Sequence, residues 1–217
     1  MRAPGNDAVQ QAERDTNAKL QRFVDVTRSK RGEAELPKGS NRSPGIDAFR
    51  PDWRRAQLAT ADATAGKQVK GEPWCAWYVT WCWFNAWGFH PLGRQIGGCY
   101  EFALEARRRG LWIDLPGRRT TDMLVAAYPG AAVVLLDKPL ASGRSEGHTA
   151  GVTGVADDGW TVSTSEGNSG DSVRDGVRKL DDPGIRGLIL PLGIEVAAGD
   201  WPRGLLSGAD VGGLSTR

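Results

Sequence analysis

The chain has 217 residues, enough for one domain with a well-buried core and too few for two full-size domains. Its 28 Lys and Arg residues against 26 Asp and Glu residues give a net charge of +2, which is too small to indicate nucleic-acid binding. Three cysteines do not make a disulfide framework, and no pair has the spacing of a zinc site.

The first 20 residues lack the apolar core of a signal peptide, and no stretch approaches the roughly 20 apolar residues of a membrane span. We therefore expect a soluble protein that is synthesised in the cytoplasm without a signal peptide and does not insert stably into a membrane. We also expect a monomer with no nucleic-acid partner.

The N-terminal segment predicts a helix only in its second part. Residues 6–30 are good helix formers, but the apolar residues take up helical spacing only from about Leu20. We predict a polar extension over residues 1–18 and then a helix that docks on the core and stops near Gly32.

The next 35 or so residues predict loops around one short helix. Residues 36–45 are rich in Gly, Ser and Pro and predict a loop. Residues 46–59 predict a short helix interrupted at Pro51, and the small, polar residues 60–71 predict a second loop.

Two further helices are expected between residues 74 and 110. Residues 74–87 are apolar on nearly every side, which is typical of a helix buried in the middle of a domain. Residues 98–110 predict a shorter helix that ends in an arginine run, interpreted as a solvated helix end.

After Gly130 the pattern favours strands. The predicted strands are 131–136, 148–156, 160–168 and 186–193, with an Asp-Asp-Gly turn between the second and the third. Helices followed by a meandering sheet indicate an α+β domain, which we place at residues 19–194. Residues 195–217 are interpreted as a C-terminal tail or linker.

Cys75 lies where a helix is expected to begin. Pro73 suits the first turn of a helix but not its interior, so Cys75 is expected within that first turn. The free N–H groups and the helix dipole there lower the pKa of a thiol from about 8.5 toward the roughly 3.5–7.5 range of reactive cysteines. Cys75 is therefore the candidate nucleophile.

The other two cysteines fit that role less well. Cys82 lies two turns further along the same apolar helix, where a thiolate would be desolvated, so we interpret it as structural. Cys99 lies beside two glycines at the next helix start and is the rival nucleophile, although nothing around it in the sequence suggests a base.

The chain has two histidines that could act as the base. His90 follows the buried helix and is placed to cap its C-terminal carbonyls. His148 opens a strand after a glycine-containing loop, where an imidazole at a sheet edge can reach outward. We therefore take His148 as the candidate base.

The hairpin turn at residues 157–159 brings polar residues toward His148. If these three residues close the loop, His148 lies opposite Asn168. Ala150 then lies opposite Glu166, whereas a shift of two positions would put Glu166 directly opposite His148. In either register a carboxylate and an amide can orient the imidazole toward the thiol. The alternative is an ordinary polar loop and a core histidine.

Four segments, in this order, resemble the CHAP family of cysteine, histidine-dependent amidohydrolases/peptidases: "GSNRSPGIDAFR", "GEPWCAWYVTWC", "GHTAGVTGV" and "VSTSEGNSG". The resemblance covers roughly Leu20 to Gly193. It implies a papain-like (CHAP) fold, with N-terminal helices packed on a C-terminal antiparallel β-sheet.

The resemblance also implies a role for each matching residue. The nucleophile falls on Cys75 and the base on His148, while Glu166 and Asn168 become the third and fourth polar members. The implied function is a peptidoglycan hydrolase acting at the bacterial cell wall, either an N-acetylmuramoyl-L-alanine amidase or an endopeptidase, as a phage lysin or a wall-remodelling enzyme. Trp74, beside the nucleophile, is the one tryptophan of its helix that we expect to contact the substrate.

Some CHAP members carry an Asp-rich calcium loop ahead of the cysteine. In the corresponding region, residues 43–71, the only carboxylates are Asp47, Asp52 and Asp62. They are too sparse for a cage of roughly six to eight oxygens, so we predict no metal and no other cofactor.

Two other functions stay open. The chain could be a non-catalytic or virion-associated CHAP-fold binding module, although such a module has no physical need for a thiol facing an imidazole. It could also be a cytosolic thiol amidase that acts on a soluble peptide.

Overall fold

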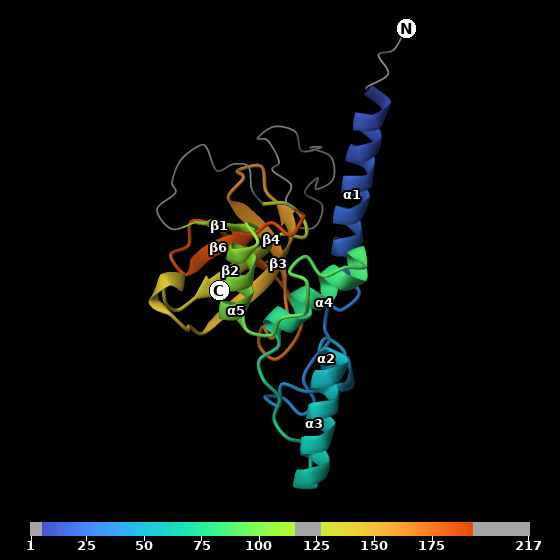
Figure 1. Cartoon of the computed structure of the whole chain (residues 1–217), viewed down its shortest axis with the longest axis vertical. Coiled ribbons are helices and arrows are strands. Elements are labelled where there is room, and N and C mark those ends of the chain that lie inside the picture. The colour runs from blue at the N-terminus through green and yellow to red at the C-terminus, as the bar shows by residue number, and fades with distance from the viewer. Residues whose placement is uncertain (1–5, 116–126, 193–217) are drawn as a thin grey trace.

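The structure, a computed structural model, describes residues 6–115 and 127–192. In this part of the chain five α-helices precede all six strands of an antiparallel sheet (Figure 1). The predicted α+β class is therefore confirmed. The predicted tail, residues 195–217, lies outside the described residues.

Helix α1 (Asn6–Arg28) is longer than the apolar pattern predicts, because the expected polar extension is helical from residue 6. Gln11 donates a hydrogen bond to Asp15 one turn later, and such pairs stabilise an exposed helix without a core. The second half docks on the core, with Leu20 and Phe23 buried. The apolar spacing thus predicted where the helix packs but not where it begins.

Helices α2 (Pro44–Asp47) and α3 (Asp52–Ala65) are separated at Pro51, as predicted. The predicted loop over residues 60–71 is wrong in its first half, because α3 continues to Ala65 and ends at Gly66. Small residues lie at many positions of this segment, and alanine has a high helix propensity, so the helix continues without a buried face.

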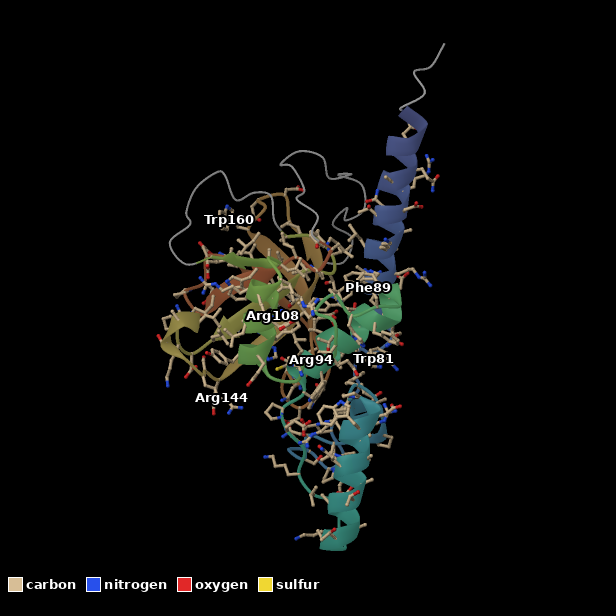
Figure 2. The ribbon with its side chains drawn as sticks, in the orientation of Figure 1. Trp81, Phe89, Arg94, Arg108, Arg144 and Trp160 are labelled. Atoms are coloured by element: carbon tan, nitrogen blue, oxygen red, sulfur yellow. The ribbon has the colours of Figure 1, made fainter. Side chains whose placement is uncertain are left out.

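Helices α4 (Cys75–Trp87) and α5 (Cys99–Arg108) confirm the two predicted helices. Helix α4 contacts both α1 and β3, and nine of its thirteen residues are buried (Figure 1). Its outer surface carries Trp81, labelled in Figure 2, with the Lys30 ammonium 5.1 Å from the ring centroid. Helix α5 packs across β2.

The sheet has the strand order β1-β6-β2-β3-β4-β5. Four strands match the predictions: β2 (Ala132–Leu136), β3 (Gly147–Val155), β4 (Thr161–Glu166) and β6 (Ile185–Ile189). The sequence did not predict the two edge strands, β1 (Trp112–Asp114) and β5 (Arg174–Lys179). β1 has only three residues, and β5 is charged and mostly exposed, so neither has an apolar period.

The register of β3 and β4 combines one predicted pairing with an irregularity. Near the site, Gly151 pairs with Ser165 and Val152 with Thr164, which continues to Ala150 opposite Glu166. A β-bulge between Val152 and Gly154 shifts the pairing by one residue toward the turn. The first of the two registers considered above therefore holds at the site, while the bulge was not predicted.

Candidate active site

Cys75 is the first residue of α4 and follows Trp74 at the N-cap position. Trp74 gives no side-chain hydrogen bond to the first turn, and that turn contains no acidic residue. The first N–H groups of a helix have no partner within it, so they and the helix dipole favour a negative charge here. Cys75 itself is 3% exposed, at the floor of the site.

The end of β4 lies against the first turn of α4 because Gly167 has no side chain. A Cβ at Gly167 would lie 2.6 Å from Tyr78 Cβ and 2.9 Å from the Trp74 ring. Tyr78 and Ser165 also share a 2.7 Å hydrogen bond between their hydroxyl groups. This contact brings the polar end of the β3–β4 hairpin to the thiol of Cys75.

His148 lies near the start of β3 and links Cys75 to Glu166. Its Nε2 lies 3.1 Å from Glu166 Oε2, while the imidazole also interacts with the Cys75 thiol. Because Nε2 is committed to the carboxylate, Nδ1 is the ring nitrogen left for the sulfur. The His148 side chain is 24% exposed, so the ring borders solvent.

Glu166 is buried, and four hydrogen bonds hold it in place. Besides His148, Thr164 donates to Oε1 at 2.7 Å, and Arg178 donates to both oxygens at 2.8 and 2.6 Å. Arg178 approaches across Gly176, where a Cβ would lie 2.5 Å from Glu166 Oε1. The carboxylate therefore has one orientation, which in turn orients the imidazole.

Sequence reasoning missed Arg178, Thr164 and Gly176 as supporting residues. Even if β5 had been predicted from its alternating charges, the strand register would have indicated Arg174, which pairs with Glu166, as the partner of this carboxylate. The Arg174 guanidinium instead bonds to Ser172 and to the Gly170 carbonyl.

The pKa values of the three groups move toward an ion pair. A hydrogen bond from Cys99 and the interaction with His148 lower the pKa of Cys75 well below its usual value, against the effect of burial. Burial lowers the pKa of His148, but Cys75 and Glu166 outweigh it and raise the pKa to about 9. Burial raises the pKa of Glu166, and its hydrogen bonds to His148, Arg178 and Thr164 bring it down to about 2. The geometry thus favours thiolate, imidazolium and carboxylate at neutral pH.

Cys99, the rival nucleophile of the sequence, lies in the same site. Its Sγ is 3.4 Å from Cys75 Sγ, and Thr149 donates its hydroxyl to Cys99 Sγ, also at 3.4 Å. The neighbouring Cys75 and burial raise the pKa of Cys99, so it stays a neutral thiol. Cys82 is fully buried, and burial raises its pKa, in agreement with a structural residue.

Two predicted site residues are placed differently from the expectation. Trp74 has no exposed surface, because it stacks on Phe49 and donates its indole N–H to Glu35 at 2.9 Å. The structure therefore contradicts a substrate contact by Trp74. Asn168 lies just beyond β4 with φ 61°, partly buried, and its side chain makes no hydrogen bond within the described residues.

The carboxylates ahead of Cys75 are paired with arginines. Arg42 contacts Asp47 at 2.9 Å and Asp62 at 3.0 Å, and Arg50 contacts Asp47 at 2.8 Å. Asp52 pairs with Arg55 on the surface of α3. Among residues 6–115 and 127–192, no three His, Cys, Asp or Glu side chains gather in a way that could hold a metal ion.

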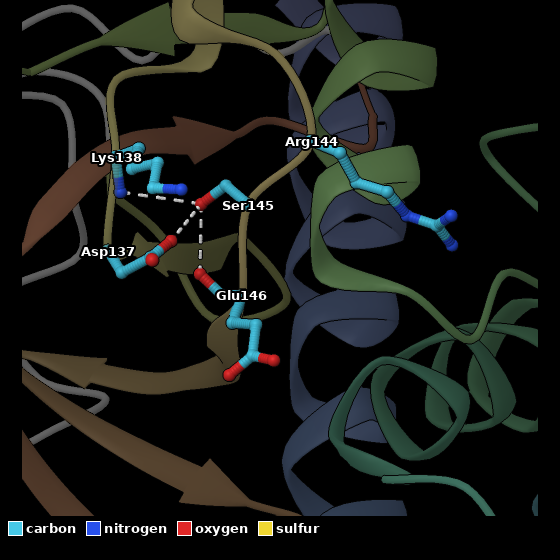
Figure 3. Close-up of a pocket in the computed structure, with 5 residues that line it drawn as sticks. All are labelled: Asp137, Lys138, Arg144, Ser145 and Glu146. Carbon is cyan, nitrogen blue, oxygen red and sulfur yellow. Dashed lines mark hydrogen bonds between the residues drawn. The ribbon is translucent and has the colours of Figure 1, made fainter.

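A shallow polar pocket of about 420 Å³ lies in the loop between β2 and β3, outside this site. Its lining consists of Asp137, Lys138, Arg144, Ser145 and Glu146, and Figure 3 shows the Ser145 hydroxyl bonded within the loop. Arg144 points away toward α5, where it pairs with Glu101 at 3.4 Å. These bonds stabilise the connection that leads into β3, the strand that carries His148.

Comparison with known protein families gives a match over the central part of the chain. Residues 67–168 match the family model described as CHAP domain, a range that includes Cys75, His148, Glu166 and Asn168. No curated protein and no solved structure gives a significant match. Within the described part of the chain, no helix is both long and apolar enough to cross a bilayer. Residues 67–168 therefore form a CHAP domain, which indicates in general a hydrolase of the peptidoglycan amidase or peptidase type.

Proposed function

We propose that this protein cleaves an amide bond in the peptide part of peptidoglycan, with Cys75 as the nucleophile, as an N-acetylmuramoyl-L-alanine amidase or an endopeptidase. A phage lysin or a wall-remodelling enzyme would use this activity. The observation that carries the proposal is the Cys75–His148–Glu166 arrangement, with a 3.1 Å contact between the imidazole and a carboxylate that Arg178 and Thr164 hold.

In the first step the Cys75 thiolate attacks the carbonyl carbon of the amide. The negative charge that develops on the carbonyl oxygen is stabilised by the free N–H groups at the start of α4. His148, as imidazolium, then gives its Nδ1 proton to the departing amine nitrogen while the C–N bond breaks. The acyl group remains on Cys75 as a thioester.

In the second step His148 takes a proton from water, and the resulting hydroxide equivalent attacks the thioester. The C–S bond breaks and the thiolate and imidazolium return. Glu166 keeps the ring in one tautomer and orientation through both steps. Asn168 lies one residue beyond Gly167, and its uncommitted amide is available to polar groups of the substrate.

The test is mass spectrometry of purified peptidoglycan after incubation with the protein. We expect new fragments whose masses identify the bond, and none with Cys75→Ala. Cys82→Ala is the matched control, because it removes a buried thiol of the same helix that plays no part in the reaction. Fragment release by Cys75→Ala would contradict the proposal.

The two alternatives predict different results. A thiol amidase for soluble peptides would leave several wall chemotypes intact while Cys75 still reacts rapidly with iodoacetamide. A non-catalytic binding module would leave the walls intact and react slowly as well.

A further inference from the structure

Two cysteines from different helices meet in the site. Cys75 begins α4 and Cys99 begins α5, and the sulfur atoms lie 3.4 Å apart. A disulfide needs about 2.05 Å between its sulfurs, so a movement of roughly 1.4 Å, shared by two side chains, would close one. A small rearrangement of the two side chains is therefore enough to form a disulfide.

The two thiols have complementary chemical states. His148 and the hydrogen bond from Cys99 favour the thiolate of Cys75, whereas Cys99 remains a neutral thiol that Thr149 contacts. Thiolates react with peroxides and thiols do not, and an adjacent thiol captures the first oxidation product before it is oxidised further. The proposed hydrolysis makes no covalent use of Cys99.

We infer that Cys75 and Cys99 form a peroxide-sensitive dithiol site, in which Cys99 captures oxidised Cys75 as a reversible disulfide. The inference rests on the proposed function in one respect, namely that Cys75 is the reactive thiolate. Formation of the disulfide removes this thiolate and stops hydrolysis until a dithiol reductant restores it.

The chemistry balances in two steps. The Cys75 thiolate attacks one oxygen of hydrogen peroxide, the O–O bond breaks, and hydroxide leaves, so that the sulfur is oxidised to a sulfenic acid. The Cys99 sulfur then attacks the Cys75 sulfur, the S–O bond breaks, and the sulfenic oxygen leaves as water with the Cys99 proton. Hydrogen peroxide is much smaller than an amide substrate, so it can reach a sulfur that such a substrate reaches.

The first experiment treats the full-length reduced protein with a few equivalents of hydrogen peroxide. We expect a product about 2 Da lighter, because two thiol hydrogens are lost. Trypsin should then yield the peptide 71–94, which contains Cys75 and Cys82, joined to the peptide 95–107, which contains Cys99. Fragmentation should place the bond at Cys75, and dithiothreitol should restore both the mass and the hydrolytic activity.

The matched variants separate capture from simple oxidation. Cys99→Ser should lose activity to peroxide irreversibly and gain about 32 or 48 Da, as sulfinic or sulfonic acid. Cys82→Ser should behave like the unchanged protein, because Cys82 makes no contact with either sulfur among the hydrogen bonds of the described residues.

Absence of the Cys75–Cys99 linkage in the oxidised, unchanged protein would overturn the inference, and so would full recovery of oxidised Cys99→Ser by dithiothreitol. The linkage is measured by mass and needs no hydrolysis, whereas the peptidoglycan test uses reduced protein. A disulfide without wall hydrolysis would therefore refute the proposed function alone, and wall hydrolysis without a disulfide would refute the dithiol site alone.

Discussion

Two polar clusters lie at the start of α4, and they behave differently. One, the arginine cluster, consists of Arg42, Arg50, Asp47, Asp62 and Glu72, and it joins α2 and α3 to the loop ahead of Cys75. The other, the thiol cluster, consists of Cys75, Cys99, His148, Glu166 and Arg178. Both contain carboxylates held by guanidinium groups.

The difference is in the protons that each cluster can exchange. In the arginine cluster burial raises the pKa of Glu72, but hydrogen bonds and the charges of Arg54 and Arg50 bring it to about 2. Guanidinium does not release its proton, so this cluster keeps its charges at neutral pH and can only hold the loop. The thiol cluster adds an imidazole and two thiols, whose protons can move. Buried ion pairs alone therefore do not indicate a catalytic site.

The largest effect is expected when the proton carrier of the thiol cluster is removed. His148→Ala should lower kcat on purified peptidoglycan by about 10³ to 10⁴-fold, because both the acid–base step and the ion pair with Cys75 are lost. The melting temperature should change little. His90→Ala, at the other histidine, stacked on Phe84, is the control and should keep its activity. Equal losses in both variants would contradict the assignment.

A substitution in the arginine cluster should instead lower the free energy of unfolding. Arg50 has no exposed side-chain surface, and Arg50→Met leaves Asp47 and Glu72 with one cation fewer. The two carboxylates are only partly buried and keep Arg42 and Arg54 as partners, so the loss of unfolding free energy should lie between about 1 kcal/mol and the roughly 3 to 5 kcal/mol of a fully buried pair, and urea denaturation would measure it. Arg55→Met, whose exposed pair with Asp52 contributes less than about 1 kcal/mol, is the control. A loss below about 1 kcal/mol for Arg50→Met would show that the cluster does not stabilise the loop.

The third variant tests the carboxylate of the thiol cluster, Glu166. Glu166→Gln should lower kcat by about 10²-fold or more, because an amide neither stabilises the imidazolium nor fixes its tautomer. The basic limb of the pH profile should move below the pKa of about 9 that His148 has beside Glu166. Arg174→Gln, at the position paired with Glu166 in the register, should leave both quantities unchanged. An unmoved basic limb in Glu166→Gln would refute the orienting role.

The smallest effect concerns the thiol pair. The reactive form needs a thiolate and an imidazolium, so kcat/KM should rise with pH through the pKa of Cys75, which lies well below its usual value, and fall through that of His148, about 9. Cys99→Ala removes the hydrogen bond that lowers the pKa of Cys75, so the acid limb should move to higher pH with only a few-fold loss of rate at neutral pH. Cys82→Ala should leave the acid limb in place, and an acid limb that also stays in place for Cys99→Ala would contradict the hydrogen bond.

Much of the fold was predictable because the spacing of apolar residues indicates which side of a helix or strand is buried. It predicted α4, α5 and the four inner strands of the sheet, whose side chains face a core. It failed for the first half of α1 and for the end of α3, where side-chain pairs and helix propensity, not apolar periodicity, extend the helix. It also failed for β5, since a charged edge strand is held by its hydrogen bonds to β4 rather than by apolar packing.

For the site, the sequence by itself determined the local chemistry: a cysteine at a helix start, a histidine at a strand start, and polar residues at the end of the next strand. Local context decides these features, since caps, turns and alternation depend on neighbours along the chain. Only the tertiary structure decided that Trp74 is buried against Phe49, that Arg178 rather than Arg174 holds Glu166, and that Cys99 lies 3.4 Å from Cys75. These are contacts between elements, set by how α4, α5 and the sheet pack, and no spacing within one element encodes them.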